Sequence, residues 1–462
     1  MTKLGLVITD GVGYRNFVLS DFLDKAKVKF DKVIIYSFIP KEAFKAHDEL
    51  TIVELSAQRE QFHHWFLRKF KEIAHLRLNS KDNFGIQDNL SANYNRNFTT
   101  RGLATRLIYL LTYLFHSEGL INGVERCQLS FLRTQKTHAD YRKSLAQDSV
   151  NVLLFTHQRP PYLLPLVAAA QELKLKTTAF IFSWDNLASK GRMAASFDHY
   201  MVWSDLMKRE LMQFYRRIRP EQASVVGTPQ FVPYVMPQYQ CSKADFHKKF
   251  ALAPDQPTLC FSCGDVSTSP NDSYYIEIIA QAMDSGVLPK RNLLVRTSPA
   301  ESGDRFEALK HRFPWIQWNH PKWPLLRSNH QENWSQRIPD AADVMDLRAI
   351  LTHSDLNINM LSTMSLDFML HDKPVINPVM GLGNHGLGND QRFLNYAHIR
   401  HLTDSVASKI ANTPEALIQC IQEYLKDDTD QSKRKAFVDQ QIGVPLNGTT
   451  DKILASLNAI AL

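Results

Sequence analysis

The sequence predicts an α/β protein with two doubly wound domains, each built on a mainly parallel sheet. Buried strand patterns alternate with helical patterns, and the alternation stops at a proline-containing stretch and then starts again. The length of 462 residues also exceeds one ordinary hydrophobic core. Strands that alternate with helices form parallel sheets, because each helix crosses back over the sheet. We therefore expect two lobes facing across a cleft at their strand ends.

The first lobe is expected to span residues 1–240. A helical stretch at about 54–146 interrupts its strands and is predicted to be an insertion. Residues 229–253 hold several prolines and polar residues and are predicted to link the lobes. The strands of this lobe are predicted at 4–9, 32–38, 150–156, 177–182, 200–203 and 223–226.

The second lobe is expected to span residues 241–462 and to end in helices. It repeats the alternation of short apolar runs with helical patterns, which again indicates a parallel sheet. Its strands are predicted at 258–262, 292–296, 315–318, 356–360 and 374–377.

Composition indicates a globular protein of the cytoplasm. Hydrophobic residues make up 44% and charged residues 22% of the chain, which is typical of a folded domain. The five cysteines are few and scattered, as expected in a reducing compartment. The N-terminus runs directly into a strand and does not have the pattern of a signal peptide. The longest apolar helical run, 107–115, is about half of a ~20-residue membrane span.

The net charge of +7 is concentrated in the window 59–106, which has nine basic and four acidic residues. The same window carries Phe62, Trp65, Phe66 and Phe70 at helical spacing. Aromatic and basic residues on one helix are typical of a helix that lies on an anionic membrane surface. The same spacing is also typical of a core-facing stripe with a solvated opposite face, which we favour.

The stretch 356–378 carries the most informative pattern: a buried strand, a hydroxyl-bearing turn, a short helix and a second buried strand. Ser362 and Thr363 fall where the first strand should end, so their hydroxyls and the following N–H groups are suited to a nucleotide phosphate. Asp367 lies about one helical turn further on, where it is placed to accept hydrogen bonds from ribose hydroxyls. Alternatively, Ser362 only caps the helix and Asp367 is a solvated acid.

This turn resembles one of four elements of the GT-B superfamily of nucleotide-sugar glycosyltransferases, especially bacterial surface-polysaccharide members. Related groups are the CDP-glycerol glycerophosphotransferases and the UDP-GlcNAc 2-epimerases. The resemblance covers 4–10 and about 150–378, and it leaves the helical insertion unmatched. The other three elements are Ser183–Asn186 with Tyr200–Ser204 and Val225–Gln230, then Phe261–Asp265, and finally Leu294–Pro299 with Asn319–Pro321.

The resemblance implies a GT-B-like fold of two Rossmann-like domains, in which the C-terminal lobe binds the donor nucleotide and the N-terminal lobe binds the acceptor. It implies that Gly264 and Asp265 form the Gly-rich turn of the donor lobe. Arg296 and His320 would approach the donor phosphate or base. The alternatives are an ion pair at the strand end for Arg296 and a satisfied turn histidine for His320. Asp367 stands where the superfamily commonly has Glu.

A transferase that inverts configuration needs a base on the acceptor hydroxyl, and Asp10 is the first candidate. It ends the first strand, where it would face the cleft, and it is followed by Gly11 and Gly13, which allow close backbone approach. Alternatively, Asp10 caps the next helix. His157 and Asp185 end neighbouring strands and are the second candidates.

Acceptor binding is assigned to the turn after the first strand. Gly11 would let backbone approach the ligand, and Arg15 and Asn16 would orient the acceptor or a donor phosphate. A retaining enzyme would need no such base.

The sequence thus predicts an enzyme, a metal-independent glycosyltransferase without a cofactor. Its expected partners are a nucleotide-sugar donor and a glycan or lipid-linked acceptor, and an anionic membrane surface is a further candidate partner. Neither a complete GxGxxG fingerprint nor a Walker loop occurs, and no nucleic-acid-binding motif is present. The alternatives are a nucleotide-sugar 2-epimerase of the same fold and a CDP-glycerol type polyol-phosphate transferase.

Overall fold

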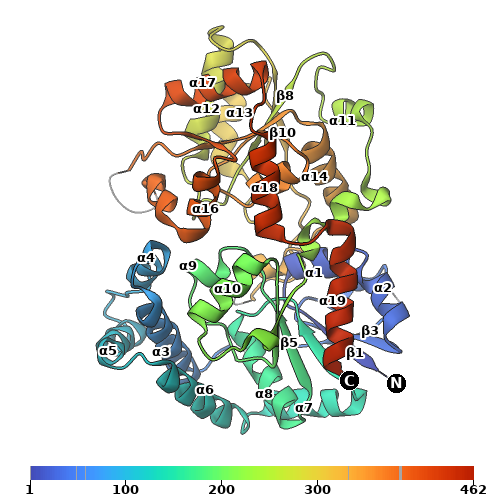
Figure 1. Cartoon of the computed structure of the whole chain (residues 1–462), viewed down its shortest axis with the longest axis vertical. Helices are drawn as coiled ribbons and strands as arrows, with labels where there is room; N and C mark the ends of the chain where they lie inside the picture. The colour runs from blue at the N-terminus through green and yellow to red at the C-terminus, as the bar shows by residue number, and fades with distance from the viewer. Residues whose placement is uncertain (1, 48, 58, 331, 384–387, 462) are drawn as a thin grey trace. The chain divides into compact units, whose positions relative to one another are not determined.

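The computed structural model describes residues 2–47, 49–57, 59–330, 332–383 and 388–461 (Figure 1). The chain divides into two compact α/β units. Unit 1 comprises Met1–Val232, Leu325–Ile338 and Gln441–Leu462, and unit 2 comprises Pro233–Pro324 and Pro339–Gln440. Each unit is built on one parallel sheet, as the sequence predicts.

The sheet of unit 1 has seven strands in the order β3-β2-β1-β4-β5-β6-β7. The chain adds β2 and β3 on one side of β1, and β4 to β7 on the other, so the direction of winding reverses between β1 and β4. In doubly wound sheets ligands bind at the carboxyl ends of the strands at this reversal. The strands are β1 (Lys3–Ile8), β2 (Lys32–Ser37), β3 (Thr51–Glu54), β4 (Val152–Phe155), β5 (Lys176–Phe180), β6 (His199–Val202) and β7 (Ala223–Val225).

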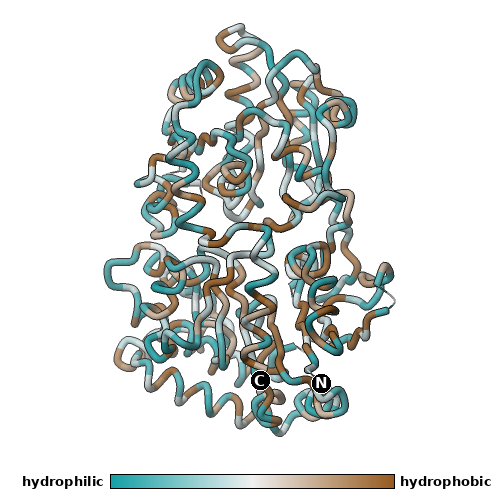
Figure 2. The backbone as a smooth tube through the Cα atoms, turned by 45° about the vertical axis from the view of Figure 1, so that its right-hand side comes forward, coloured by the Kyte–Doolittle hydropathy of each residue, from teal (hydrophilic) through white to brown (hydrophobic). Residues whose placement is uncertain are grey.

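The sheet of unit 2 has six strands in the order β10-β9-β8-β11-β12-β13, and its reversal lies between β8 and β11. The strands are β8 (Thr258–Ser262), β9 (Asn292–Arg296), β10 (Gln317–Asn319), β11 (Leu356–Ile358), β12 (Val375–Pro378) and β13 (Lys409–Ala411). All residues of β8, β9, β11 and β12 are buried, because helices cover the sheet. Figure 2 shows the hydrophobic residues gathered along the central strands.

The predicted helical insertion lies between β3 and β4. Its helices are α3 (Phe62–Asn79), α4 (Phe84–Ala92), α5 (Thr100–Leu114), α6 (Glu118–Leu132) and α7 (Lys136–Asp148). Trp65 and Phe70 of α3 are each only 8% exposed, so the core-facing interpretation holds for them, whereas Phe62 is 46% exposed. The aromatic stripe of α3 is therefore mainly a packing surface against its neighbours.

The remaining helices connect the strands and cover the sheets. In unit 1 they include α1 (Gly11–Phe17), α2 (Phe22–Lys29), α8 (Leu164–Glu172), α9 (Asn186–Ser189) and α10 (Asp205–Phe214). From unit 2 to the C-terminus they are α11 (Lys243–Lys249), α12 (Asp272–Asp284), α13 (Glu307–Arg312), α14 (Ala341–His353), α15 (Met364–Leu370), α16 (Ala397–Ser405), α17 (Pro414–Lys426), α18 (Gln431–Ile442) and α19 (Leu446–Ala461). None of the described helices is both long and apolar enough to cross a membrane.

The two compact units do not divide at a single point in the sequence, because two later segments belong to unit 1. Helix α19 buries Ile453, Leu454 and Leu457 and lies beside β4, β5 and α2 (Figure 1). Segment 325–338, which we call the strap, lies on the first unit as well, and Gln336 Nε2 donates to the carbonyl of Phe38 at 3.4 Å. Both contacts are long-range packing that no local pattern encodes.

Candidate active site

Asp10 stands directly after β1, at the winding reversal of the first sheet, and its side chain is fully buried. One carboxylate oxygen caps α1 by accepting from the backbone N–H of Gly13 at 2.8 Å. The other accepts from the hydroxyl of Thr9 at 2.7 Å and lies 3.1 Å from Nδ1 of His157. The predicted helix cap is confirmed, and the enclosed carboxylate does not present a free oxygen to an acceptor.

His157 follows β4, the strand next to β1, so the two sides of the reversal meet in the Asp10–His157 pair. Burial acts to raise the pKa of Asp10, but the hydrogen bond and charge of His157 and the bonds from Gly13 and Thr9 outweigh it and lower the pKa. An ionised Asp10 only accepts, so Nδ1 of His157 donates to it. In neutral His157 the free lone pair is then on Nε2.

An aromatic ring also packs against the face of the His157 imidazole. It stacks on Phe182 with ring centroids 3.9 Å apart and planes inclined by 17°. A carboxylate on one nitrogen and an aromatic plane on the ring fix both the tautomer and the orientation of an imidazole, which is the arrangement of a positioned general base.

His157 lines a cavity of about 350 Å³ in unit 1, which we call the His157 cavity. Its lining residues are Arg68, Glu72, His157, Arg159, Pro160, Pro161, Arg192, Ala194, Glu332 and Trp334. Arg68 is paired with Glu60 at 2.8 Å, and Arg192 with Glu118 at 2.6 Å. Among the described side chains, none forms a hydrogen bond or ion pair with the guanidinium of Arg159. Arg159 is therefore the arginine of this cavity that is available for an anionic group.

The strap supplies Glu332 and Trp334 to the same cavity. Burial raises the pKa of Glu332, and the negative charge of Asp10 raises it further. Its Oε2 atom is buried and forms no hydrogen bond with the part of the chain that the structure describes. Sequence reasoning missed Arg159, Glu332 and Trp334. Arg159 had a local signal, two residues after His157 at a strand end, whereas the strap residues had none.

Gly11 is placed against the strap. A Cβ atom at Gly11 would lie 1.8 Å from the carbonyl oxygen of Arg337, so only glycine fits there. The close backbone approach predicted for Gly11 is observed, but the approaching group is protein backbone. Gly11 therefore helps to seat the strap at the reversal.

The other predicted residues of unit 1 do not line the His157 cavity. Asp185 pairs with Lys190 at 3.2 Å and stands at the start of α9. Arg15 donates through Nε to Oδ1 of Asn16 at 3.2 Å, and Asn16 is only 2% exposed. Asn16 thus serves local structure.

In unit 2, the reversal between β8 and β11 brings two predicted turns to one sheet edge. After β11, the backbone N–H of Ser362 donates to Oδ1 of Asn359 at 2.8 Å, and Ser362 Oγ accepts from the N–H of Met364 at 3.1 Å. Leu361 has a φ of +52°, which turns the chain sharply before the hydroxyls. Ser362 and Thr363 stay partly exposed, while α15 starts directly behind them.

Buried asparagines on the strands set the geometry of this turn. Asn357 donates to Ser262 Oγ at 2.8 Å, Asn359 donates to Asn357 at 2.6 Å, and Asn377 donates to the carbonyl of Asn359 at 2.8 Å. The three asparagines are fully buried. A connected polar network inside a sheet rigidifies its surroundings, so the Ser362–Thr363 turn is held by side chains of three adjacent strands.

Asp367 is only 3% exposed, and its carboxylate accepts from the hydroxyl of Tyr234. This residue is neither the solvated acid of one prediction nor an exposed ribose ligand. Its burial on the short helix α15 indicates that it fixes the chain entering unit 2 to that helix.

Arg296 is engaged in a buried ion pair, as the alternative prediction proposed. Its Nη2 lies 3.0 Å from Oδ2 of Asp343, and its Nη1 donates to Asn319. Asp343 also accepts from Trp323 Nε1 at 2.8 Å. Burial acts to raise the pKa of Asp343, but the charge and hydrogen bond of Arg296 outweigh it and lower the pKa.

His320 is exposed and lies beside Trp318, with ring planes inclined by 8° and centroids 6.3 Å apart. Its Nδ1 is 3.1 Å from the hydroxyl of Thr297. Burial of part of the ring and the charge of Lys310 lower its pKa. A neutral imidazole at the end of β10 keeps one nitrogen for a ligand.

Gly264 and Asp265 begin a tight turn after β8. A Cβ atom at Gly264 would lie 2.4 Å from Ser269 Oγ, so the turn requires glycine. Its carbonyl accepts from Arg305 at 2.7 Å, and Asp265 accepts from the N–H of Ser267 at 2.9 Å. Both predicted residues lie at the reversal of the second sheet, and their polar groups hold the turn.

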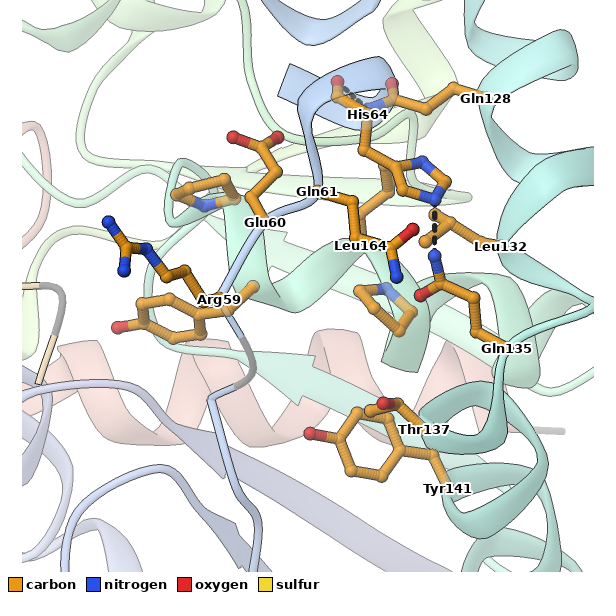
Figure 3. A pocket seen from close by; sticks show the side chains of 13 residues that line it. Arg59, Glu60, Gln61, His64, Gln128, Leu132, Gln135, Thr137, Tyr141 and Leu164 are labelled. Carbon is orange, nitrogen blue, oxygen red and sulfur yellow. Dashed lines mark hydrogen bonds between the residues drawn. The ribbon is translucent and has the colours of Figure 1, made fainter.

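A smaller cavity of about 50 Å³ lies under α3 and α6 in unit 1 (Figure 3). In Figure 3 Gln135 points to the ring of His64, and Gln128 donates to the His64 carbonyl at 3.2 Å. This volume holds little more than water and is too small for a sugar. Among the described residues, no group of three His, Cys, Asp or Glu is placed to hold a metal ion.

Similarity to known proteins is confined to structure. No family model and no curated protein matches the sequence. A glycosyltransferase from Rickettsia africae ESF-5 aligns over 99% of this chain and 98% of its own, with a TM-score of 0.53 and 12% identity. A putative UDP-N-acetylglucosamine 2-epimerase from Listeria monocytogenes aligns over 99% of this chain and 96% of its own, with a TM-score of 0.55 and 10% identity. HepE of Anabaena, solved with UDP and glucose, aligns over 99% of this chain and 100% of its own, with a TM-score of 0.50 and 12% identity.

These similarities show the fold of the chain. With its two parallel sheets of seven and six strands, it has the GT-B fold, as the sequence predicts. At identities of 10–12%, they do not assign a reaction.

Proposed function

We propose that the protein is a glycosyltransferase that moves a sugar from a nucleotide-activated donor to the hydroxyl group of a glycan or lipid-linked acceptor. The Asp10–His157 pair at the first winding reversal carries this proposal, because Asp10 engages Nδ1 of His157 and His157 lines a cavity of about 350 Å³ that has room for a sugar. Unit 1 binds the acceptor in this proposal, and unit 2 binds the nucleotide.

In this proposal His157 is the catalytic base and Asp10 is a positioning residue. Nε2 of His157 takes the proton of the acceptor hydroxyl while that oxygen attacks the anomeric carbon. The bond from this carbon to the diphosphate breaks, and the electron pair leaves with the nucleoside diphosphate. Asp10 stabilises the imidazolium that forms, because it already accepts from Nδ1 at 3.1 Å. Such a single displacement inverts the configuration of the sugar.

The donor residues of unit 2 fall into two roles. The partly exposed hydroxyls of Ser362 and Thr363, together with His320, bind the diphosphate and stabilise the departing charge. Arg296 and Asp367 position the strand ends, because a buried partner already holds each of them. Gly264 and Asp265 shape the turn opposite Ser362. These roles need no metal ion.

We place the reaction in bacterial surface-polysaccharide synthesis, in the cytoplasm at the inner face of the membrane. A lipid-linked acceptor carries phosphate, and Arg159 beside His157 suits such an anionic group. The Rickettsia glycosyltransferase and the Anabaena protein solved with UDP and glucose share the fold, which supports a nucleotide-sugar donor.

A 2-epimerase is the second candidate, because the putative Listeria epimerase has the same fold at a TM-score of 0.55. The two reactions differ in their products. The protein is incubated with UDP-, GDP- and dTDP-sugars and with CDP-glycerol, with and without a bacterial lipid extract. Acceptor-dependent release of a nucleoside diphosphate, with a labelled sugar in the lipid fraction, is the expected result.

Two other product patterns contradict this proposal. Conversion of UDP-GlcNAc to its 2-epimer without an acceptor would establish the epimerase. Release of CMP from CDP-glycerol would establish the polyol-phosphate transferase. His311→Ala, at an exposed site on α13, serves as the matched histidine control for His157→Ala and is expected to match the wild type.

A further inference from the structure

Helix α5 presents its apolar side to solvent, which reverses the usual pattern of a helix in a folded domain. Its buried side is small and mostly polar, formed by Gly102, Thr105, Ile108 and Thr112. Its outer side carries leucines at helical spacing: Leu103, Leu107, Leu110 and Leu114, which are 55%, 48%, 63% and 65% exposed.

Aromatic residues extend this surface at both ends of the helix. Phe98 is 89% exposed before α5, and Tyr113 and Phe115 are 68% and 58% exposed at its end. These three residues and the four leucines are here called the α5 apolar face. Single exposed leucines are common on proteins, but seven large exposed side chains on one helix and its two ends mark an interaction surface.

Polar contacts fix this orientation. On α3, Arg77 donates to Thr112 Oγ1 at 3.2 Å and to the carbonyl of Tyr109 at 3.1 Å. At the other end, Thr99 caps Gly102, where a Cβ atom would lie 2.0 Å from the carbonyl of Asn97. A roll that buried the leucines would break these bonds, so the apolar face is built to point outward. Figure 1 shows α5 at the border of the helical insertion, beside α3.

The charge around this face has one sign. From Asn89 to Ser117 the sequence holds three arginines, one histidine and no acidic residue. Arg96 is exposed, and the guanidinium of Arg106 lies 4.7 Å from the ring centre of Phe98. Arg101 is directed to α3 instead, with its guanidinium 5.2 Å from the ring centre of Trp65. Arginines next to exposed leucine and aromatic side chains match the boundary between acyl chains and anionic headgroups.

We infer that the α5 apolar face is a docking surface for an anionic lipid bilayer. The leucines and Phe98 enter the acyl boundary, and Arg96 and Arg106 bind lipid phosphates. A second copy of the chain is a poorer occupant, because a twofold contact would bring Arg96 and Arg106 of each copy together without an acid from the stretch 89–117. This inference moves the membrane contact from the α3 aromatics to α5, and it stands independently of the reaction proposed above.

Vesicle co-sedimentation of the full chain tests the inference. The wild type is expected to bind vesicles of phosphatidylcholine with phosphatidylglycerol, and to bind vesicles of phosphatidylcholine alone at least tenfold more weakly. Leu107→Gln/Leu110→Gln is expected to lower partitioning at least tenfold. Its matched control is Val28→Gln/Val287→Gln, which changes residues that are 90% and 57% exposed elsewhere and should bind as the wild type.

The charge contribution has its own pair of variants. Arg96→Gln/Arg106→Gln should weaken binding several-fold and reduce its salt dependence, whereas Lys136→Gln/Lys143→Gln on α7 should not. No binding to either vesicle, or equal binding of the leucine variant and its control, would overturn the inference. So would a wild-type dimer that Leu107→Gln/Leu110→Gln converts to monomer without lipid. Melting temperatures equal to the wild type verify that the variants are folded.

Discussion

The two sheet edges of this protein differ in how far their charged groups are satisfied. At the edge of unit 1, Arg159 forms no hydrogen bond or ion pair with a described residue. The Oε2 atom of Glu332 forms no hydrogen bond with a described residue either. At the edge of unit 2, Arg296 is held by Asp343 at 3.0 Å, and Asp367 accepts from Tyr234. Both edges lie at a winding reversal, so topology alone does not cause the difference.

This contrast separates groups that are available to a ligand from groups that position others. Arg159 and Glu332 are only partly buried, so a charged group without a hydrogen bond or ion pair at this edge can still bind a ligand. A buried ion pair mainly maintains local geometry, and breaking it costs stability. The first edge therefore carries the chemistry in our proposal, and the second edge is a preformed frame for the nucleotide.

Removal of the imidazole at position 157 should have the largest effect. His157→Ala is expected to lower the transfer rate about 1000-fold, because the acceptor hydroxyl loses its base. The nucleotide dissociation constant should stay within about twofold, since the donor residues that we propose all belong to unit 2. Steady-state rates and calorimetry are measured on the same preparation, and a variant with full turnover would exclude His157 as the base.

Arg296→Gln should act on stability. It leaves Asp343 buried without its ion-pair partner and is expected to lower the free energy of unfolding by about 3 kcal/mol. The matched control is Arg312→Gln, because Arg312 is 56% exposed where it pairs with Glu277, and such pairs contribute about 0.5 kcal/mol. Urea unfolding measures both variants. Unchanged stability with lost nucleotide affinity would make Arg296 a phosphate ligand instead.

Asp10→Asn should lower the transfer rate about 100-fold and spare donor binding, because the amide lacks the charge that stabilises the imidazolium, and an NH2 that donates to Nδ1 of His157 keeps the proton on Nε2. The pKa of Asp10 is lowered in the folded state, so its stabilising contribution is present above its unfolded pKa of about 4 and is lost as the pH falls through the folded value. The stability difference between wild type and variant should therefore shrink below about pH 4. A constant difference would show that the carboxylate charge has no part in it.

The mildest change is Ser362→Ala with Thr363→Val, which should weaken nucleotide binding about tenfold through two lost hydrogen bonds. Ser285→Ala with Thr403→Val removes two hydroxyls that bond to their own helices in the same unit, and it should leave binding unchanged. Calorimetry measures the nucleotide dissociation constant of the test variant and of the control variant. An unchanged dissociation constant in the first variant would remove the phosphate role from this turn.

Sequence patterns located most of the sheet because buried strands such as β8 and β9 are continuous apolar runs, and their bounds were predicted as observed. The strands β3 and β13 were missed because they have only four and three residues and are partly exposed. The residue types at Asp10, His157, Ser362 and Thr363 also marked the ends of strands next to the reversals.

The missed features depend on packing between distant segments. The strap carries Glu332 to His157 from far along the chain, and α19 returns to the first unit. Within the insertion, α3 and α5 both carry apolar residues at helical spacing, but the two helices differ in how far these residues are buried. The α3 aromatics Trp65 and Phe70 are 8% exposed, whereas Leu110 of α5 is 63% exposed. Periodicity identifies an apolar face, and only the fold shows whether it is covered.

The assignment of the catalytic base to unit 1 and of nucleotide binding to unit 2 is tested by comparing the thermal shifts that nucleotides cause in three variants. UDP, GDP, CMP, CDP, ADP and dTDP are screened, with and without Mg²⁺, against the wild type, His157→Ala and Ser362→Ala/Thr363→Val. A ligand at 100 times its dissociation constant stabilises the folded state by about 2.7 kcal/mol. We predict that one nucleotide raises the melting temperature of the wild type and of His157→Ala equally, without metal, and raises that of the double variant less. No shift with any nucleotide, or a shift that His157→Ala abolishes and the double variant retains, would contradict the account.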